Sequence, residues 1–228
     1  MANSVVFDDA IEIPLSLQSL SEFRAWATSD AFPERGRIDY LAGRIEVDMS
    51  PEDVFCHGAL KVELIRVVSQ RVKTANLGHL FTDRTRVSLP QADLSVEPDL
   101  VFVSYESLSS GRVRLIPKAG GEPGRYVELE DGPDLIVEIV SDRSVAKDVR
   151  RLPNLYFRGG IGEYWLADAR GARLAFDILA RGQGRFQPVA TDADGYRPSQ
   201  ALGCRYRLDG ERNERGEWRF DLIEKPFA

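Results

Sequence analysis

Residues 134–140, with the sequence Asp-Leu-Ile-Val-Glu-Ile-Val, are the feature that most constrains the fold of this chain. After Asp134 every position except Glu138 is Ile, Val or Leu, which is typical of a strand buried on both faces. Such a strand belongs at the centre of a sheet that other layers cover. Helical patterns stand on either side of it, at residues 50–73 and 143–158. We therefore predict an α/β (α+β) fold with a mixed central sheet flanked by helices.

Weaker patterns complete the expected order of elements. Ser19 and Glu22 form a capping-box pattern that predicts a short helix. Ser50 followed by Pro51 predicts the start of the long helix, with Ser50 as its N-cap. The remaining expectations are a hairpin at residues 38–47, strands at 80–89 and 96–105, an inserted hairpin or flap at 107–132, and strands at 170–228 that extend the same sheet in antiparallel fashion. A length of 228 residues suits a single domain over residues 1–228.

The composition excludes several classes of protein. The chain has 30 basic and 36 acidic residues, a net charge of −6, so it is not expected to coat nucleic acid without regard to sequence. No run reaches the roughly 18 apolar residues of a membrane span, and the N-terminus lacks the pattern of a secretory signal. The two cysteines make neither a disulfide framework nor a zinc motif. We expect a cytoplasmic protein without a membrane partner.

Two acids stand inside apolar strand patterns, and they carry most of the functional information. Asp99 precedes Leu-Val-Phe-Val, and Glu138 lies within residues 134–140. An unpaired buried carboxylate costs several kcal/mol, so such an acid is normally protonated, paired with a base or bound to a metal. If the two strands are neighbours, Asp99 and Glu138 can together hold one Mg²⁺. Pairing with Arg84, Arg86 or another arginine of the sheet explains the same acids without a metal, and the sequence leaves both interpretations open.

A basic segment follows Glu138. It contains five basic residues and two acidic ones: Arg143, Lys147, Arg150, Arg151 and Arg158 against Asp142 and Asp148. A positive patch beside a pair of metal-binding acids is what phosphodiester hydrolysis requires, although a solvated helix face explains the same charges. His57 lies on the inward face of the long helix, where a core histidine is the simpler interpretation. Glu52 is most simply a partner of the helix dipole, and both residues are kept as accessory candidates.

Several short motifs occur in a characteristic order. They are residues 38–47, Ser50-Pro51, His57, residues 97–103, residues 133–141, Asp148, Tyr156 and residues 160–168. Together they resemble the Uma-type restriction endonuclease family of bacteria, a branch of the PD-(D/E)XK nuclease superfamily, over residues 19–180. The resemblance implies a restriction-endonuclease-like fold. It also implies a Mg²⁺ or Mn²⁺ site made by Asp99, Glu138 and the backbone carbonyl of Ile139.

The resemblance also exposes a departure. The family pattern places a lysine two residues after Glu138 or four residues after Asp148, and this chain has Val140 and Leu152 there. Lys147 is the nearest lysine, and Arg151 is the next candidate.

These observations favour one function and leave others open. The first hypothesis is a metal-dependent endonuclease that cuts DNA as a homodimer. Asp99 and Glu138 hold the metal, Lys147 assists the attacking water, and Arg150 and Arg151 contact phosphate. The second hypothesis is a non-catalytic nucleic-acid-binding or assembly protein that keeps the fold. A carboxylate-pair hydrolase acting on sugars ranks last, because the basic segment fits phosphate better.

Overall fold

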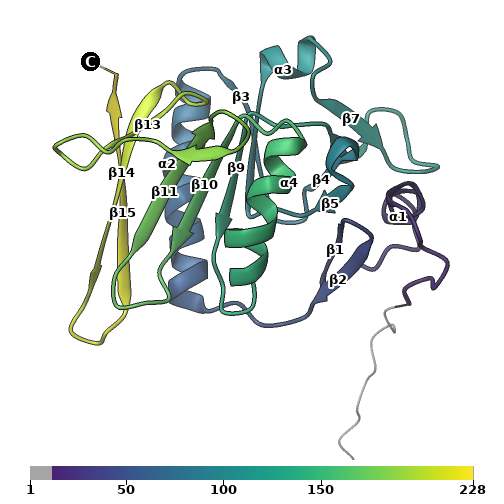
Figure 1. Cartoon of the computed structure of the whole chain (residues 1–228), viewed down its shortest axis with the longest axis horizontal. Coiled ribbons are helices and arrows are strands. Elements are labelled where there is room, and N and C mark those ends of the chain that lie inside the picture. Colours follow the sequence, from purple (N-terminus) through teal and green to yellow (C-terminus); the bar gives the residue numbers. More distant parts are fainter. Residues whose placement is uncertain (1–11, 228) are drawn as a thin grey trace, which may run out of the picture.

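The computed structural model describes residues 12–227, which form a mixed α+β fold (Figure 1). The central sheet has the strand order β12-β11-β10-β9-β6-β3. Its strands are β3 (Gly78–Thr82), β6 (Leu100–Ser104), β9 (Leu135–Ile139), β10 (Glu163–Asp168), β11 (Ala175–Arg181) and β12 (Phe186–Pro188). Strands β9 and β10 are parallel, and the other neighbours are antiparallel. All five residues of β9 are buried, which confirms the predicted central strand.

The prediction of one continuous sheet is wrong, because a second and a third sheet stand beside the first. The second has the order β2-β1-β5-β4-β8-β7, and the third has the order β13-β14-β15. Their strands are β1 (Arg37–Leu41), β2 (Arg44–Asp48), β4 (Arg86–Leu89), β5 (Leu94–Val96), β7 (Arg114–Pro117), β8 (Tyr126–Glu130), β13 (Arg197–Ser199), β14 (Cys204–Arg212) and β15 (Trp218–Pro226). Only β11 and β12 extend the central sheet at its C-terminal side.

Local turns explain why the chain changes sheets. The strand expected at residues 80–89 is broken at Arg84, whose φ of 66° is left-handed, so β3 and β4 join different sheets. The hairpin expected within residues 107–132 is formed by β7 and β8. Strand β8 also pairs in parallel with β4, so this insertion is part of the second sheet.

Side chains cap the first N–H groups of some of the helices. The helices are α1 (Leu20–Ala27), α2 (Leu60–Thr74), α3 (Tyr105–Ser109) and α4 (Leu152–Arg158), with a 3-10 turn η2 (Pro90–Ala92) and π-type turns η1 (Val54–Ala59) and η3 (Ala146–Arg151) leading into α2 and α4. Ser19 caps α1 as predicted. Ser50 does not cap the long helix; the Asp53 carboxylate accepts from the N–H groups of Phe55 and Cys56 instead. Pro153 lies in the first turn of α4, where its missing N–H costs little.

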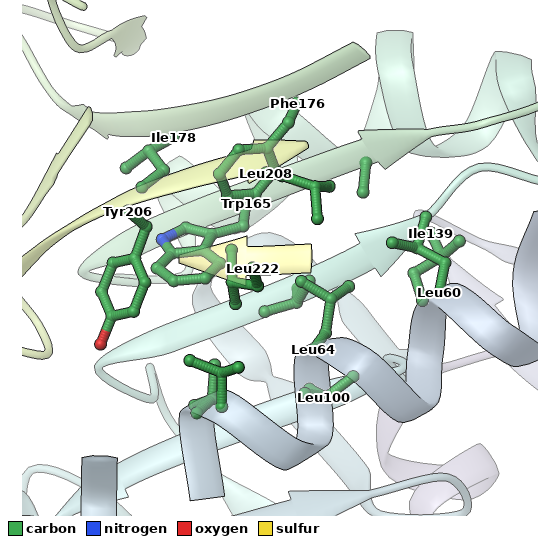
Figure 2. Close-up of a cluster of buried hydrophobic side chains, with 14 of the residues drawn as sticks. Leu60, Leu64, Leu100, Ile139, Trp165, Phe176, Ile178, Tyr206, Leu208 and Leu222 are labelled. Atoms are coloured by element: carbon green, nitrogen blue, oxygen red, sulfur yellow. The ribbon is translucent and has the colours of Figure 1, made fainter. Parts of the chain in front are cut away.

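Each face of the central sheet has its own apolar core. On one face, α2 and the third sheet both pack against the central sheet, and Trp165 lies among Leu64, Ile178 and Leu222 (Figure 2). On the other face, α4 covers Ile136 and Tyr164. Because side chains alternate along a strand, Glu138 shares the second face with Ile136. No helix within residues 12–227 is long and apolar enough to cross a membrane.

Candidate active site

The structure brings Asp99 and Glu138 together. Strands β6 and β9 are antiparallel with Leu100 opposite Val137, so the next pair in this register is Asp99 and Glu138. The Ile139 N–H donates to Asp99 Oδ2 at 2.7 Å, which joins the end of β9 to the start of β6. The two residues are 2% and 1% exposed. The two acids are therefore adjacent on neighbouring strands, which is the condition for the predicted metal site.

Asp99 is an ionised acid held by donors. Its Oδ1 lies 3.1 Å from Lys61 Nζ and 3.5 Å from His57 Nε2. Burial favours a raised pKa, but the hydrogen bond from His57 and the charges of Lys61 and Arg37 outweigh it and hold the pKa of Asp99 well below its usual range. Asp99 thus carries a negative charge at neutral pH.

The carboxyl group of Glu138, unlike that of Asp99, has a raised pKa. Tyr156 donates its hydroxyl proton to Glu138 Oε1 at 2.6 Å, and Arg37 Nη2 lies 3.4 Å from Oε2. Burial raises the pKa of Glu138 to about 8, the charge of Arg37 opposes the rise, and the carboxylates of Asp148 and Asp99 add to it. In the protein alone, Glu138 is therefore mostly protonated at neutral pH. A divalent cation between Asp99 and Glu138 would reverse that balance.

His57 and Glu52, the two accessory candidates, lie beside Asp99. One ligand atom each from Glu52, His57 and Asp99 lie within 4.8 Å of one another. His57 is buried, as expected of a core histidine, but its ring lies between two acids. Its Nδ1 approaches Glu52 Oε2 to 3.0 Å without forming an aligned hydrogen bond. Burial lowers the pKa of His57, and the hydrogen bond and charge of Asp99 raise it by more.

The basic residues named from the sequence occupy different environments. Lys147 Nζ lies 3.0 Å from Asp39 Oδ2, so Asp39 rather than Glu138 or Asp99 is its direct partner. Arg151 forms two hydrogen bonds with Glu46 on β2, and Arg150 is exposed.

Arginine pairing explains the two acids only in part. Arg86 binds Glu97 and the Ile38 carbonyl instead of Asp99 or Glu138. The arginine that does contact Glu138 is Arg37.

A cavity of about 380 Å³ opens at this cluster. One wall comes from the segment that leads into η1, including Ser50, Asp53 and His57. The other wall comes from the loop that follows β9, including Ser141 and Arg143. The carboxylate oxygens and the histidine nitrogen are donor atoms that Mg²⁺ or Mn²⁺ can bind, and the cavity lies beside them.

A family comparison agrees with this geometry. The family model Uma2, described as "Putative restriction endonuclease", matches residues 20–209. The chain belongs to this family. The Uma2 family match spans both candidate acids and every residue of the cluster, and it confirms the resemblance deduced from the ordered motifs.

A solved structure shares the fold of this Uma2 family member. It is titled as a putative nuclease belonging to DUF820 from Anabaena variabilis ATCC 29413. The two chains are 20% identical, the match covers 81% of this chain and 90% of the other, and the TM-score is 0.58. No curated protein matches the chain.

Sequence reasoning missed part of this Uma2 site. In the sequence, Arg37 and Asp39 look like exposed polar positions of a hairpin. In the fold, β1 places Arg37 against Glu138 and Asp39 against Lys147. Lys61 was detectable, because it follows His57 by four residues and so lies on the same face of the helix.

Proposed function

We propose that this Uma2 family member is a Mg²⁺- or Mn²⁺-dependent endonuclease that hydrolyses phosphodiester bonds of DNA. The observation that carries the proposal is the adjacency of Asp99 and Glu138, two buried acids in register on neighbouring strands, beside His57, which lines a cavity. They supply the paired carboxylates that a metal-dependent nuclease needs. Family membership adds independent support.

The metal ligands in this proposal are Asp99, Glu138 and the backbone carbonyl of Ile139. Glu52 and His57 would complete the site, since one ligand atom of each lies within 4.8 Å of an oxygen of Asp99. Asp148 fits the same picture, because its Oδ1 is buried and has no hydrogen-bond partner among the described residues. The bound cation would lower the pKa of a water molecule and neutralise charge on the phosphoryl oxygens.

The protein's own residues position the reactants. Lys147 is held by its ion pair with Asp39. Burial lowers the pKa of Lys147, but nearby acids, Asp39 foremost, raise it by more, so as an ammonium group it would orient the attacking water or neutralise developing charge. Arg150 is free to meet a phosphate group at the surface. Arg151 would first have to exchange Glu46 for phosphate.

Cleavage of a supercoiled plasmid with Mg²⁺ or Mn²⁺ tests the proposal. We expect wild type to cut, and Asp99→Ala and Glu138→Ala to lose at least about 10²-fold in rate, the scale on which single groups at such sites act. Asp209→Ala is the control, because Asp209 is a surface residue of β14 paired with Arg207. Equal rates in wild type and both site variants would refute the proposal.

The alternative function is nucleic-acid binding or assembly without catalysis. It is favoured by Val140 and Leu152 at the two positions where the family pattern has lysine, and by the engagement of Lys147 with Asp39. Wild-type protein that binds Mn²⁺ and duplex DNA but does not cut the DNA would support this alternative.

A homodimer is part of the proposal, because two copies of one site cut both strands of a duplex readily. Sedimentation velocity measures the mass of the particle. A dimer that cuts in concert would convert supercoiled plasmid to linear product with little accumulation of the nicked form.

A further inference from the structure

Three cations surround the acids of the proposed site, and each has different partners. Lys61 lies 3.1 Å from Asp99 and 2.7 Å from Asp83. Lys147 lies 3.0 Å from Asp39. Arg37 reaches two acids from β1, with Nε 3.3 Å from Asp39 Oδ2 and Nη2 3.4 Å from Glu138 Oε2. Arg37 is therefore the cation in direct contact with Glu138.

Exposure separates Arg37 from the two lysines. The side chains of Lys61 and Lys147 are 8% and 10% exposed, whereas that of Arg37 is 24% exposed. A substrate can reach only a group that solvent can reach. Arg37 is thus the most accessible of the three cations that line the acid pair.

Arg37 also has donors to spare. A guanidinium group carries five N–H donors in a planar fork that matches the geometry of phosphate. The Nη1 of Arg37 has no hydrogen-bond partner among the described residues and is not among the buried unpartnered atoms, and the contact of Nη2 with Glu138 is long at 3.4 Å. Lys61, by comparison, is bound at 2.7 Å by Asp83. The loosely held guanidinium is the one that can take a new acceptor.

We propose that Arg37 is a catalytic residue that donates hydrogen bonds to a non-bridging oxygen of the scissile phosphate, supplying the positive charge absent at Val140 and Leu152. This inference rests on the proposed nuclease function. Position 140 carries no donor, and Leu152 is completely buried in the apolar core under α4. The charge of Arg37 instead enters from β1, a strand of the second sheet.

The chemistry assigned to Arg37 leaves it unchanged. The oxygen of a water molecule forms a bond to phosphorus while the bond to one bridging oxygen breaks, and that bond's electron pair leaves with the bridging oxygen. One proton of the water passes to a base or solvent, and the leaving oxygen gains a proton to become an alcohol. Negative charge grows on the non-bridging oxygens during this exchange, and donors already in place stabilise it.

Arg37→Met and Arg37→Lys test the inference, with Arg71→Met as the matched control. The Arg71 side chain is also 24% exposed and forms an ion pair, with Glu224 at 4.0 Å, but it lies at the opposite end of α2 from His57. In plasmid cleavage we expect kcat of Arg37→Met to fall at least about 10²-fold. We expect Arg37→Lys to keep an intermediate rate and Arg71→Met to match wild type.

Two binding measurements, made without cleavage, distinguish a catalytic role of Arg37 from a structural one. In EDTA, fluorescence anisotropy with a short duplex should show weaker binding for Arg37→Met and a salt dependence reduced by about one phosphate contact. The loss in kcat should exceed this loss in binding. Calorimetry with Mn²⁺ should show an affinity for the ion that is at least that of wild type, because a positive charge beside Glu138 has been removed.

The outcomes are distinguishable. Wild type that never cuts would remove the proposed function and this inference together. Wild type that cuts, with Arg37→Met within about threefold of it, would overturn the inference alone. Loss of cleavage accompanied by loss of Mn²⁺ binding or a lower melting temperature would show that Arg37 is structural, and would also overturn it.

Discussion

Two buried glutamates on neighbouring parallel strands, Glu138 on β9 and Glu163 on β10, show how differently the same side chain can be used. Their exposed fractions are 1% and 3%. Burial raises the pKa of both. What separates them is the set of hydrogen-bond donors that each carboxyl group receives.

Glu163 is fully partnered. Its Oε1 accepts from Trp165 Nε1 at 2.6 Å and Ser199 Oγ at 2.5 Å. Its Oε2 accepts from the backbone N–H groups of Gln200, at 2.9 Å, and Ala201, at 3.4 Å. These partners hold the segment after β13 against the central sheet. The side chain leaves no acceptor unused, which is typical of a structural acid.

Glu138 is left incomplete. It has one hydroxyl donor in Tyr156 and one loose contact with Arg37, and the acids Asp99 and Asp148 lie close enough to raise its pKa. The arrangement costs stability whenever Glu138 is ionised, since like charges in a dry site repel. The contrast teaches that an acid's missing partners, more than its burial, indicate a place for an external cation.

The largest expected effect is on stability at Glu163. In Glu163→Gln, the amide NH₂ must face one pair of donors, so two N–H or O–H groups lose their acceptor. Each such loss in a buried site costs about 1–3 kcal/mol, which predicts a loss of about 2–6 kcal/mol in the free energy of unfolding. Urea denaturation at pH 7 measures it.

Glu138→Gln is the matched variant for that measurement. An amide resembles the protonated carboxyl group of the folded protein, and it removes the ionisation that stabilises the unfolded wild type at pH 7, so we expect no loss but a gain on the order of a few kcal/mol. Equal losses in the two variants would remove the distinction between the two glutamates.

The next effect is the pH dependence of stability. Glu138 has a pKa of about 8 in the folded protein and an ordinary value of 4.5, so between these values the folded state binds more protons than the unfolded state. The contribution of Glu138 to the free energy of unfolding is therefore full below pH 4.5 and is lost as the pH rises through 8. We expect a decline on the order of a few kcal/mol across this window.

Glu138→Gln should flatten that decline when melting is followed from pH 5 to pH 9. The raised pKa of His57 has the same sign and remains in both proteins, so only the difference between the two curves reports Glu138. Parallel curves would contradict the assignment.

The sequence predicted the central strand and the two acids because both rest on local patterns. The apolar run at residues 134–140 predicts a buried strand, and the single acid within it stands out. The register that sets Asp99 against Glu138 needed only the assumption that the two strands are neighbours. The capping box at Ser19 is equally local.

The predictions that failed concern turns without a sequence pattern, local side-chain contacts, or contacts between distant segments. Arg84 turns the chain out of the central sheet, and an arginine at a positive φ has no sequence pattern to predict it. The helix begins three residues later than expected, with Asp53 as its cap, and both the N–H and the hydroxyl of Ser50 donate to Asp48 instead. Arg37 and Asp39 reach Glu138 and Lys147 only because the second sheet packs beside the first.

Proton release on metal binding is a smaller effect that sharpens the comparison. At pH 7 Glu138 is mostly protonated, so a cation that binds its carboxylate must displace that proton. Titration calorimetry with Mn²⁺ in two buffers of different ionisation enthalpy should show that wild type releases up to about one proton more than Glu138→Gln, because any proton that His57 loses is released by both proteins. Ser199→Ala, which leaves the partners of Glu138 unchanged, should match wild type. Release that is the same in all three proteins would show that Glu138 is not a ligand.

The smallest effect comes from removing one donor from each glutamate. Tyr156→Phe deletes the hydroxyl that binds Glu138, and Ser199→Ala deletes one of the four donors to Glu163. Tyr156→Phe should cost about 1 kcal/mol of stability, the net value of one hydrogen bond, and Ser199→Ala about 1–2 kcal/mol, because Ser199 Oγ also accepts from the Leu202 N–H. Their effects on cleavage should differ, because only Tyr156 orients a carboxyl group of the proposed metal site. We expect a rate about tenfold lower for Tyr156→Phe, on the scale of the 10–100-fold that partners of metal ligands contribute, and no change for Ser199→Ala. Equal rates in the two variants would mean that Tyr156, like Ser199, serves the fold alone.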